Sequence, residues 1–444
     1  MKNKKEQSKK VENKKENARS LALLTLKKCE ASGQFSNIAL DLALNKSALE
    51  SSDRALATTL FYGVIEKRIT LDYIISCLSS WDICEIDRDT LMLLRMGIYQ
   101  LRFLDRIPDH AAINETVALA TAKTKGFVNA VLRSYTRQGR GIEFPSEKDG
   151  EARALSVRFS VCESLAEKMC AIFGYEKSKS ILASLEGKDL ITLRVNSLKI
   201  SRDELLAKVG GEKTPLSPHG IKTSGQVAGL YGFEDGMFYV QDEASQLCAM
   251  ALDAKEGDVV VDTCSCPGSK SFGIALDMKN KGEIYSFDLH ANKLSLVESM
   301  AKRLSIDIIK TEARDARKPR EELIGKVDRV LCDVPCSGFG VLKKKPELRY
   351  KDPEVSCALP NIQYDILESS ARYLRKGGVL VYSTCTIFPE ENEKNIERFL
   401  AAHKEFSLCP FSVGELDCES GMITLLPDEH GTDGFFMAKL IKNG

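Results

Sequence analysis

The sequence lacks the features that mark several common classes of protein. No apolar run approaches the roughly 20 residues that span a bilayer, and the lysine-rich N-terminus has no apolar segment behind it, so it is not a secretory signal. The 14 cysteines form no paired Cys-x-x-Cys, and the five histidines stand far from any cysteine pair. We therefore expect no membrane contact, no metal, and free thiols in a reducing cytoplasm.

Two further absences narrow the possible ligands. The formal net charge is zero, so any contact with nucleic acid must come from local basic patches. No Gly-x-Gly-x-x-Gly sequence occurs, so the cradle for a dinucleotide pyrophosphate is missing. A nicotinamide-dependent oxidoreductase is therefore a remote alternative.

What is present indicates a soluble protein of several domains. The chain has 444 residues, 43% hydrophobic and 28% charged, which is enough for two or three cores. Helical periodicity fills 21–140, a Gly-, Arg- and Glu-rich linker occupies 141–150, and mixed α and β patterns fill 151–240. From 241 to 444 strands alternate with helices. The predicted fold is an all-α domain, a small α+β subdomain and an α/β doubly wound, Rossmann-like domain with a terminal antiparallel addition.

Residues 1–20 have a composition of their own. They are almost all Lys, Glu, Asn, Gln and Ser, with seven lysines and Arg19 against three glutamates. This composition is typical of a disordered solubilising tail. The alternative is a basic tether for RNA phosphates.

Two predicted strands of the α/β domain end in cysteine. The strand Val327–Asp333 is followed by Pro335 and Cys336, and the strand 379–384 by Cys385. In a doubly wound sheet of order 3-2-1-4-5 these strands are neighbours, about 4.8 Å apart. We expect both thiols to project into one cleft. The alternative, a small buried hydrophobe, fits most of the other cysteines better.

The preceding strands end in groups suited to an adenosine. The strand 259–262 leads into a turn at Gly268, where doubly wound folds bind ligands, and the next strand ends at Asp288, roughly 20 residues on, where an acid can bind ribose hydroxyls. Asp315, after the third strand, could accept a hydrogen bond from the adenine amino group. S-adenosylmethionine fits this set, although each acid alone could be a helix N-cap or a surface charge.

A thiol beside a methyl donor predicts methylation of cytosine at carbon 5. Carbon 5 is too weak a nucleophile until a thiolate adds to carbon 6, which is covalent catalysis. Asp333 can hydrogen-bond N3 of the base if it is protonated or shares a proton. The base must leave its stack, which suits single-stranded or splayed RNA.

The same residues resemble a known family. Asp333-Val-Pro-Cys336-Ser-Gly is similar to its DAPCSG motif, Ser383-Thr-Cys385-Thr to its TCS motif, and Cys264-Ser-Cys-Pro-Gly-Ser-Lys270 to its CAAPGGK string. These are motifs of the RNA 5-methylcytosine methyltransferases. The resemblance implies that Cys385 is the nucleophile and that Cys336 assists product release, a division that spacing alone does not decide. It places S-adenosylmethionine on Cys264, Ser265, Cys266, Pro267, Gly268, Ser269, Lys270, Asp288, Asp315 and Asp333.

The helical domain carries a second resemblance. Asn114-Glu-Thr-Val-Ala-Leu-Ala120 and Lys125-Gly-Phe-Val-Asn-Ala-Val-Leu-Arg133 are similar to NusB-like RNA-binding domains. Together the motifs narrow the family to the Sun/RsmB type, which acts on 16S ribosomal RNA. We expect a cytoplasmic, monomeric RNA methyltransferase; methylation of transfer RNA or other ribosomal RNA is the alternative. Strings 388–392 and 433–436 match further family motifs, and we expect them to shape the cleft.

Other expectations concern cofactor strain and RNA contact. Ser269 replaces a family glycine, and a positive φ there would cost on the order of 1 kcal/mol. Such a cost motivates a further alternative, an RNA-binding assembly module with an inactive transferase domain. Candidate RNA contacts, for which structural roles are equally expected, are Arg133, Arg194, Asn196 and a phosphate-binding rail of Lys343, Lys344, Lys345, Arg349 and Lys351.

Overall fold

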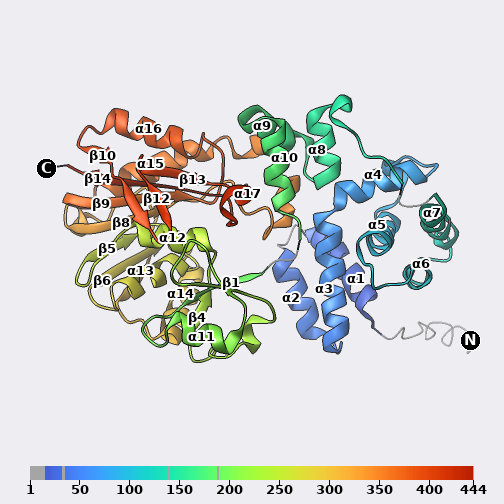
Figure 1. Ribbon diagram of the computed structural model, residues 1–444, viewed down its shortest axis with the longest axis horizontal. Coiled ribbons are helices and arrows are strands. Elements are labelled where there is room, and N and C mark those ends of the chain that lie inside the picture. Colours follow the sequence, from blue (N-terminus) through green and yellow to red (C-terminus); the bar gives the residue numbers. More distant parts are fainter. Residues whose placement is uncertain (1–15, 33–35, 139–140, 188–189, 444) are drawn as a thin grey trace, which may run out of the picture. The chain divides into compact units, whose positions relative to one another are not determined.

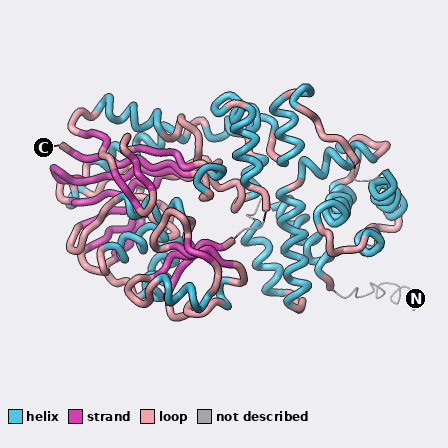
Figure 2. Tube along the Cα trace, viewed as in Figure 1, coloured by secondary structure: helices cyan, strands magenta, loops and turns pink. Residues whose placement is uncertain are grey.

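The structure is a computed structural model that describes residues 16–32, 36–138, 141–187 and 190–443. The predicted tail 1–20 lies outside the described residues except for its last five. Two compact units make up the chain: unit 1 is 1–175 with 345–351, and unit 2 is 176–344 with 352–444. Among the described residues, every strand belongs to unit 2 (Figure 2).

Unit 1 is all-helical, as predicted. Its central helix, α5, buries residues on nearly every side, which is typical of a helix surrounded by others. The Asp87 side chain caps α5 by accepting a hydrogen bond from Thr90 N at 3.0 Å. The helices are α1 (Ala18–Ser32), α2 (Ser36–Lys46), α3 (Ser51–Glu66), α4 (Arg68–Leu78), α5 (Arg88–Phe103), α6 (Asp109–Leu119), α7 (Lys125–Gln138), α8 (Glu151–Phe159) and α9 (Glu163–Phe173) (Figure 1).

The Lys125–Arg133 string folds as α7. Val128, Val131 and Leu132 form its buried stripe, as predicted, while Arg133 is exposed and donates to Asn129 Oδ1 at 3.0 Å. Arg133 is thus available to RNA, and that contact stays a prediction.

The division into units differs from the predicted boundaries in two places. Residues 151–175 lie in unit 1 because α8 packs on α4, where Thr70 Oγ1 donates to Val157 O at 2.7 Å. The segment 345–351, with its 3₁₀ turn Pro346–Tyr350, also belongs to unit 1, although it lies between two strands of unit 2 in the sequence. The ring of Tyr350 lies 3.8 Å from the guanidinium carbon of Arg68, and the side chain of Arg349 is buried.

Unit 2 begins with α10 (Tyr175–Ser184) and a small antiparallel sheet of order β2-β3-β1-β4. Helix α11 starts with a capping box in which Ser201 and Glu204 bond each other's backbone N–H. The strands and helix are β1 (Ile191–Val195), α11 (Arg202–Val209), β2 (Glu212–Lys213), β3 (Gly220–Thr223) and β4 (Phe238–Val240). This matches the predicted small α+β region.

The large sheet has the order β10-β14-β9-β8-β5-β6-β7, with β13 paired to β14. Strands β5 to β9 are parallel and follow the predicted order 3-2-1-4-5, as β7-β6-β5-β8-β9, and β14 adds antiparallel to β9. The strands are β5 (Val259–Asp262), β6 (Glu283–Asp288), β7 (Ile309–Ala313), β8 (Val327–Asp333), β9 (Leu374–Thr384), β10 (Phe406–Leu408), β13 (Met422–Leu425) and β14 (Phe435–Lys442); β11 (Phe411–Val413) and β12 (Leu416–Cys418) form a separate pair.

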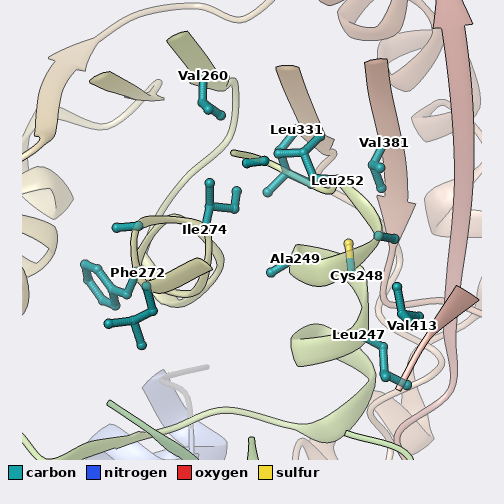
Figure 3. Close-up of a cluster of buried hydrophobic side chains, with 14 of the residues drawn as sticks. Leu247, Cys248, Ala249, Leu252, Val260, Phe272, Ile274, Leu331, Val381 and Val413 are labelled. Carbon is teal, nitrogen blue, oxygen red and sulfur yellow. The ribbon is translucent and has the colours of Figure 1, made fainter. Parts of the chain in front are cut away.

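Helices cover both faces of the large sheet. Neighbouring residues of β5 show this, since Val260 packs with α12–α14 and Val261 with α15 and α16. Figure 3 shows the first of these layers, with Ile274 facing Val260 and Leu247 beside Val413. The helices are α12 (Glu243–Ala251), α13 (Ser269–Asp277), α14 (Ala291–Leu304), α15 (Leu359–Ala371), α16 (Glu393–Ala402) and the short α17 (Pro427–His430). In the part of the chain that the structure describes, no helix is long and apolar enough to cross a membrane.

Candidate active site

The two cysteines at the strand ends meet. Strands β8 and β9 run parallel with Asp333 opposite Ser383, so both chains emerge at the same edge of the sheet. Cys336 Sγ and Cys385 Sγ lie 3.0 Å apart, and neither forms a disulfide; both are partly buried. Cys385 N also donates to Cys336 Sγ at 3.2 Å. The prediction that both thiols face one cleft is supported by this geometry.

The loop after Cys336 packs tightly against the Asp433–Phe436 string. Gly340 N donates to Cys385 O at 2.9 Å, and Gly434 N donates to Gly340 O at 2.8 Å. A Cβ on Gly340 would lie 1.9 Å from Gly434 O. These contacts hold the loop of one cysteine against the backbone of the other.

Asp333 lies beside the cysteines but is not a free carboxyl. Its Oδ2 accepts from Lys270 Nζ at 2.7 Å, and its Oδ1 accepts from Ser383 Oγ at 2.7 Å. Burial alone would lower the pKa of Lys270, but the carboxylate of Asp333 holds that pKa above its ordinary value. Lys270 is therefore an ammonium that is hydrogen-bonded to Asp333.

The turn after β5 has the properties of a ligand cradle. Gly268 has φ +103°, and a Cβ there would lie 2.5 Å from the Phe272 ring, so only glycine fits. Ser265 Oγ and Asp262 Oδ1 are buried without a hydrogen-bond partner among the described residues. Burial raises the pKa of Asp262 to about 7, against a hydrogen bond from Ser271. Unpaired polar atoms beside a glycine turn fit a polar ligand such as the methionine end of S-adenosylmethionine.

The acids after β6 and β7 differ in their surroundings. Asp288 accepts from the backbone N–H groups of Cys266 at 3.2 Å and His290 at 2.9 Å, which fixes the carboxylate and leaves lone pairs for ribose hydroxyls. Asp315 pairs with its neighbour Arg317, whose guanidinium donates at 2.8 Å. The hydrogen bonds from Arg317 lower the pKa of Asp315. A contact from Asp315 to adenine stays a prediction and requires sharing with Arg317.

The two cysteines of the Cys264–Lys270 string are not reactive thiols. Burial raises the pKa of Cys264 well above its ordinary value and that of Cys266 to about 12, so both remain protonated at neutral pH. Pro267 is exposed, and Ser269 is the first residue of α13. Ser269 is not among the residues with positive φ, so the expected strain does not arise. The motive for an inactive transferase domain is removed with it.

Two predicted RNA contacts are wrong. Arg194 is fully buried and donates to Asp277 Oδ1 at 2.8 Å and to Gly273 O at 3.1 Å. Asn196 is fully buried as well, and its amide donates to Gly236 O at 2.9 Å and to a carbonyl of α14 at 2.8 Å. Because neither side chain reaches solvent, neither can contact RNA. Arg194 instead ties β1 to α13, and Asn196 ties the end of β1 to α14.

The predicted phosphate-binding rail is also corrected. Arg349 is buried and donates to Phe159 O at 3.0 Å within unit 1. Lys344 Nζ lies 2.6 Å from Asp242 and 2.7 Å from Asp433, which neutralise it. Arg349 and Lys344 are thus removed from the rail, and contact of Lys343, Lys345 and Lys351 with RNA phosphates stays a prediction.

Two buried residues of the site were not singled out by sequence reasoning. Glu391 lies in the 388–392 string, but no pattern distinguished it from its neighbour Glu390. Gln363 of α15 carries no signal at all, since its partner Pro335 O is remote in sequence and only folding brings them to 3.0 Å. Both hold the loop of Cys336 through hydrogen bonds to its backbone.

The fold and the site define a methyltransferase. The doubly wound sheet carries an adenosine-type cradle after β5, an acid after β6 and two thiols at the ends of β8 and β9. These features are those of an S-adenosylmethionine-dependent enzyme that acts on RNA. The family models agree: residues 249–441 match the 16S rRNA methyltransferase RsmB/F family, and residues 16–137 match the NusB family. The chain belongs to the RsmB/F family and is an rRNA methyltransferase whose cofactor is S-adenosylmethionine.

Relatives resemble the chain over nearly its full length. It is 38% identical to a probable ribosomal RNA small subunit methyltransferase B of Bacillus subtilis, with 97% of this chain and 100% of the relative covered. It is 33% identical to ribosomal RNA small subunit methyltransferase B of Escherichia coli, with 97% and 99% covered.

Solved structures of other proteins are similar to this chain in fold. The crystal structure of PH0851 covers 96% of this chain and 98% of its own, with a TM-score of 0.77 and 29% identity. NSun6 from Pyrococcus horikoshii with SFG covers 63% and 97%, with a TM-score of 0.57 and 26% identity. The full-length match extends to the helical domain, whereas the match to NSun6 covers about two thirds of this chain.

Proposed function

We propose that the protein methylates carbon 5 of a cytosine in 16S ribosomal RNA through a covalent bond between Cys385 and carbon 6 of the base. The observation that carries the proposal is the pair of cysteine sulfurs 3.0 Å apart at the end of the sheet, beside the Lys270–Asp333 pair. One thiol suffices for a nucleophile. A second at this distance fits a reaction with both an addition and an elimination.

The first step belongs to Cys385. Its thiolate forms the bond to carbon 6, and the electron pair of the carbon 5–carbon 6 double bond moves into the ring, towards N3. Lys270 Nζ and Asp333 Oδ2 lie 2.7 Å apart, so the Lys270–Asp333 pair shares the proton that stabilises N3. This is the second form of the sequence prediction, in which Asp333 shares a proton.

The elimination belongs to Cys336. When bound, S-adenosylmethionine supplies an electrophilic methyl group for the activated carbon 5. The thiol of Cys336 then gives its own proton to solvent, and its sulfur, now a thiolate, takes the proton from carbon 5. The bond between carbon 6 and Cys385 breaks, the ring double bond returns and Cys385 leaves as a thiolate. One proton is released overall.

RNA binding is proposed for both units. A flipped or single-stranded cytosine is the expected substrate because carbon 6 is shielded in a stack. The NusB-type domain presents exposed Arg133 on α7 for phosphate contact. A cytoplasmic location and a monomeric state, with no metal required, are part of the same proposal.

The test is methyl transfer to purified small-subunit RNA, followed by bisulfite mapping. We expect Cys385→Ser to abolish transfer, and Cys336→Ala to accumulate a protein–RNA adduct that survives denaturation. Cys418→Ser, which replaces a buried cysteine of β12, serves as the control and should turn over normally. Normal turnover by Cys385→Ser would refute the covalent mechanism, and methylation of transfer RNA alone would reassign the substrate.

A further inference from the structure

The peptide groups on both sides of Cys336 are held by two buried side chains. Pro335 O accepts from Gln363 Nε2 at 3.0 Å, and Ser337 N donates to Glu391 Oε2 at 2.9 Å. The same Gln363 Nε2 donates to Glu391 Oε2 at 2.7 Å. Gln363 is itself oriented by Asn395, whose amide donates to Gln363 Oε1 at 3.2 Å. Cys336 thus rests on a network whose only charge is that of Glu391.

Glu391 is an unusual group for this position. Its residue is 3% exposed, and no Lys, Arg or His among the described residues forms an ion pair with it. Burying a carboxylate without a cation is costly, and a glutamine could accept the same N–H groups without a charge. Holding the loop therefore does not explain why residue 391 carries a charge.

The charges around the two sulfurs are asymmetric. Glu391 faces the Cys336 side, and its charge raises the pKa of that thiol after three larger causes, the hydrogen bond with Cys385, burial and the charge of Cys385. The N–H of Cys385 opposes this as a donor to Cys336 Sγ, but its effect is smaller than that of Glu391. On the other side, the ammonium of Lys270 is paired with Asp333 at 2.7 Å and interacts more weakly with Cys385. Three further titratable groups lie nearby and stay protonated: Tyr382, whose hydroxyl donates to Glu391 O at 2.6 Å, and the thiols of Cys248 and Cys332, whose pKa burial raises to about 12.

We infer that Glu391 is a positioning residue that keeps the proton shared by the two sulfurs on Cys336, so that Cys385 is the thiolate in the resting enzyme. At 3.0 Å a single proton can bridge the sulfurs. The negative charge of Glu391 behind Cys336 has no counterpart near Cys385, where the charges of Lys270 and Asp333 balance, so it favours the form Cys336–SH with Cys385–S⁻. Two thiols at one edge of the sheet are thereby made unequal. The inference deepens the proposed function, since it supplies a physical reason why Cys385 attacks, and it rests on that proposal only for its catalytic meaning.

The experiment measures thiol reactivity without RNA or cofactor. The full-length protein is treated with limiting iodoacetamide from pH 6 to pH 9, and alkylation of Cys336 and Cys385 is measured by peptide mass spectrometry. In the wild type we expect Cys385 to react first. In Glu391→Gln we expect the Cys385-to-Cys336 ratio to fall by about tenfold, the effect of one pKa unit on the thiolate fraction.

Two variants separate charge from structure. Glu391→Asp keeps the charge and should keep the preference for Cys385, although it shortens the side chain. Glu397→Gln removes a charge from the exposed side of α16 and should change nothing. Wild-type protein that alkylates Cys336 first would overturn the inference even if Glu391→Gln fails to fold. An unchanged ratio in a folded Glu391→Gln would do so as well.

The two proposals fail separately. If the alkylation preference follows Glu391 but no methylcytosine forms, the proton assignment stands and the proposed reaction fails. If methylation proceeds through Cys385 but the ratio ignores Glu391, only the inference about Glu391 is lost.

Discussion

Replacing Arg194 with methionine should destabilise unit 2 without removing a contact to RNA. Arg194 of β1 is fully buried, and its side chain reaches across to α13 of the large sheet, where it pairs with Asp277. Gly273 leaves room for the guanidinium, since a Cβ there would lie 2.3 Å from Arg194 Nη1. The buried pair is one of several polar contacts that join β1 and its neighbours to the helices of the large sheet.

The expected magnitude follows from the loss of one partner. Without Arg194, Asp277 retains no cation within hydrogen-bond distance, since His219 Nε2 is 4.0 Å away and burial lowers the pKa of that histidine. Breaking a buried pair in this way costs about 3–5 kcal/mol of unfolding free energy. For a unit of this size the melting temperature should fall by on the order of 10 °C.

The assay is calorimetric melting of the full chain. The double variant Arg194→Met/Asp277→Leu should recover most of the loss, because removing both charges leaves neither one unpaired. Lys208→Met, on the exposed side of α11, should change stability by less than about 0.5 kcal/mol. Arg194→Met within about 1 kcal/mol of the wild type, together with weakened RNA binding, would refute the structural role and restore the original prediction.

Three further changes test the site. Asp262→Asn should flatten the pH dependence of stability. The folded pKa of Asp262, about 7, lies above the ordinary 3.8, so the native state holds the proton more tightly and the stability of the wild type falls as pH rises between those values. A pH series of melting temperatures in which wild type and variant run parallel would contradict this. Gly340→Ala should abolish methyl transfer, because its Cβ would collide with Gly434 O, whereas Gly126→Ala in the open first turn of α7 should be active; equal activity would be the contrary result. Asp288→Ala should weaken S-adenosylmethionine binding about 10- to 100-fold by calorimetry, from the loss of charge-assisted hydrogen bonds, and unchanged affinity would remove Asp288 from the cofactor site.

Strand patterns were readable from the sequence where burial is continuous. The bounds of β5, β6 and β8 match the predicted strands 259–262, 283–288 and 327–333. The prediction was wrong for β7, placed at 306–310 but observed at Ile309–Ala313. An edge strand takes its position from pairing with β6, where Ile284 lies opposite Ile309, rather than from its own apolar run.

Pairing with a neighbouring strand also makes one strand longer than the sequence predicted. Strand β9 begins at Leu374 instead of residue 379, because Leu374 pairs with Val327 across a register shift. The intervening Arg-Lys-Gly-Gly has no strand propensity, so only the neighbouring strand reveals it.

The family and the order of the strands were predictable from the sequence alone, because short motifs and burial patterns are local properties; the roles of Cys385 and Cys336 stay a prediction. The environment of each group was decided by tertiary structure. Folding paired Lys270 with Asp333, buried Arg194 and placed Glu391 behind Cys336. Such neighbours are far apart in the chain, and their charges act through space, so the proton balance of the two thiols is a property of the folded protein.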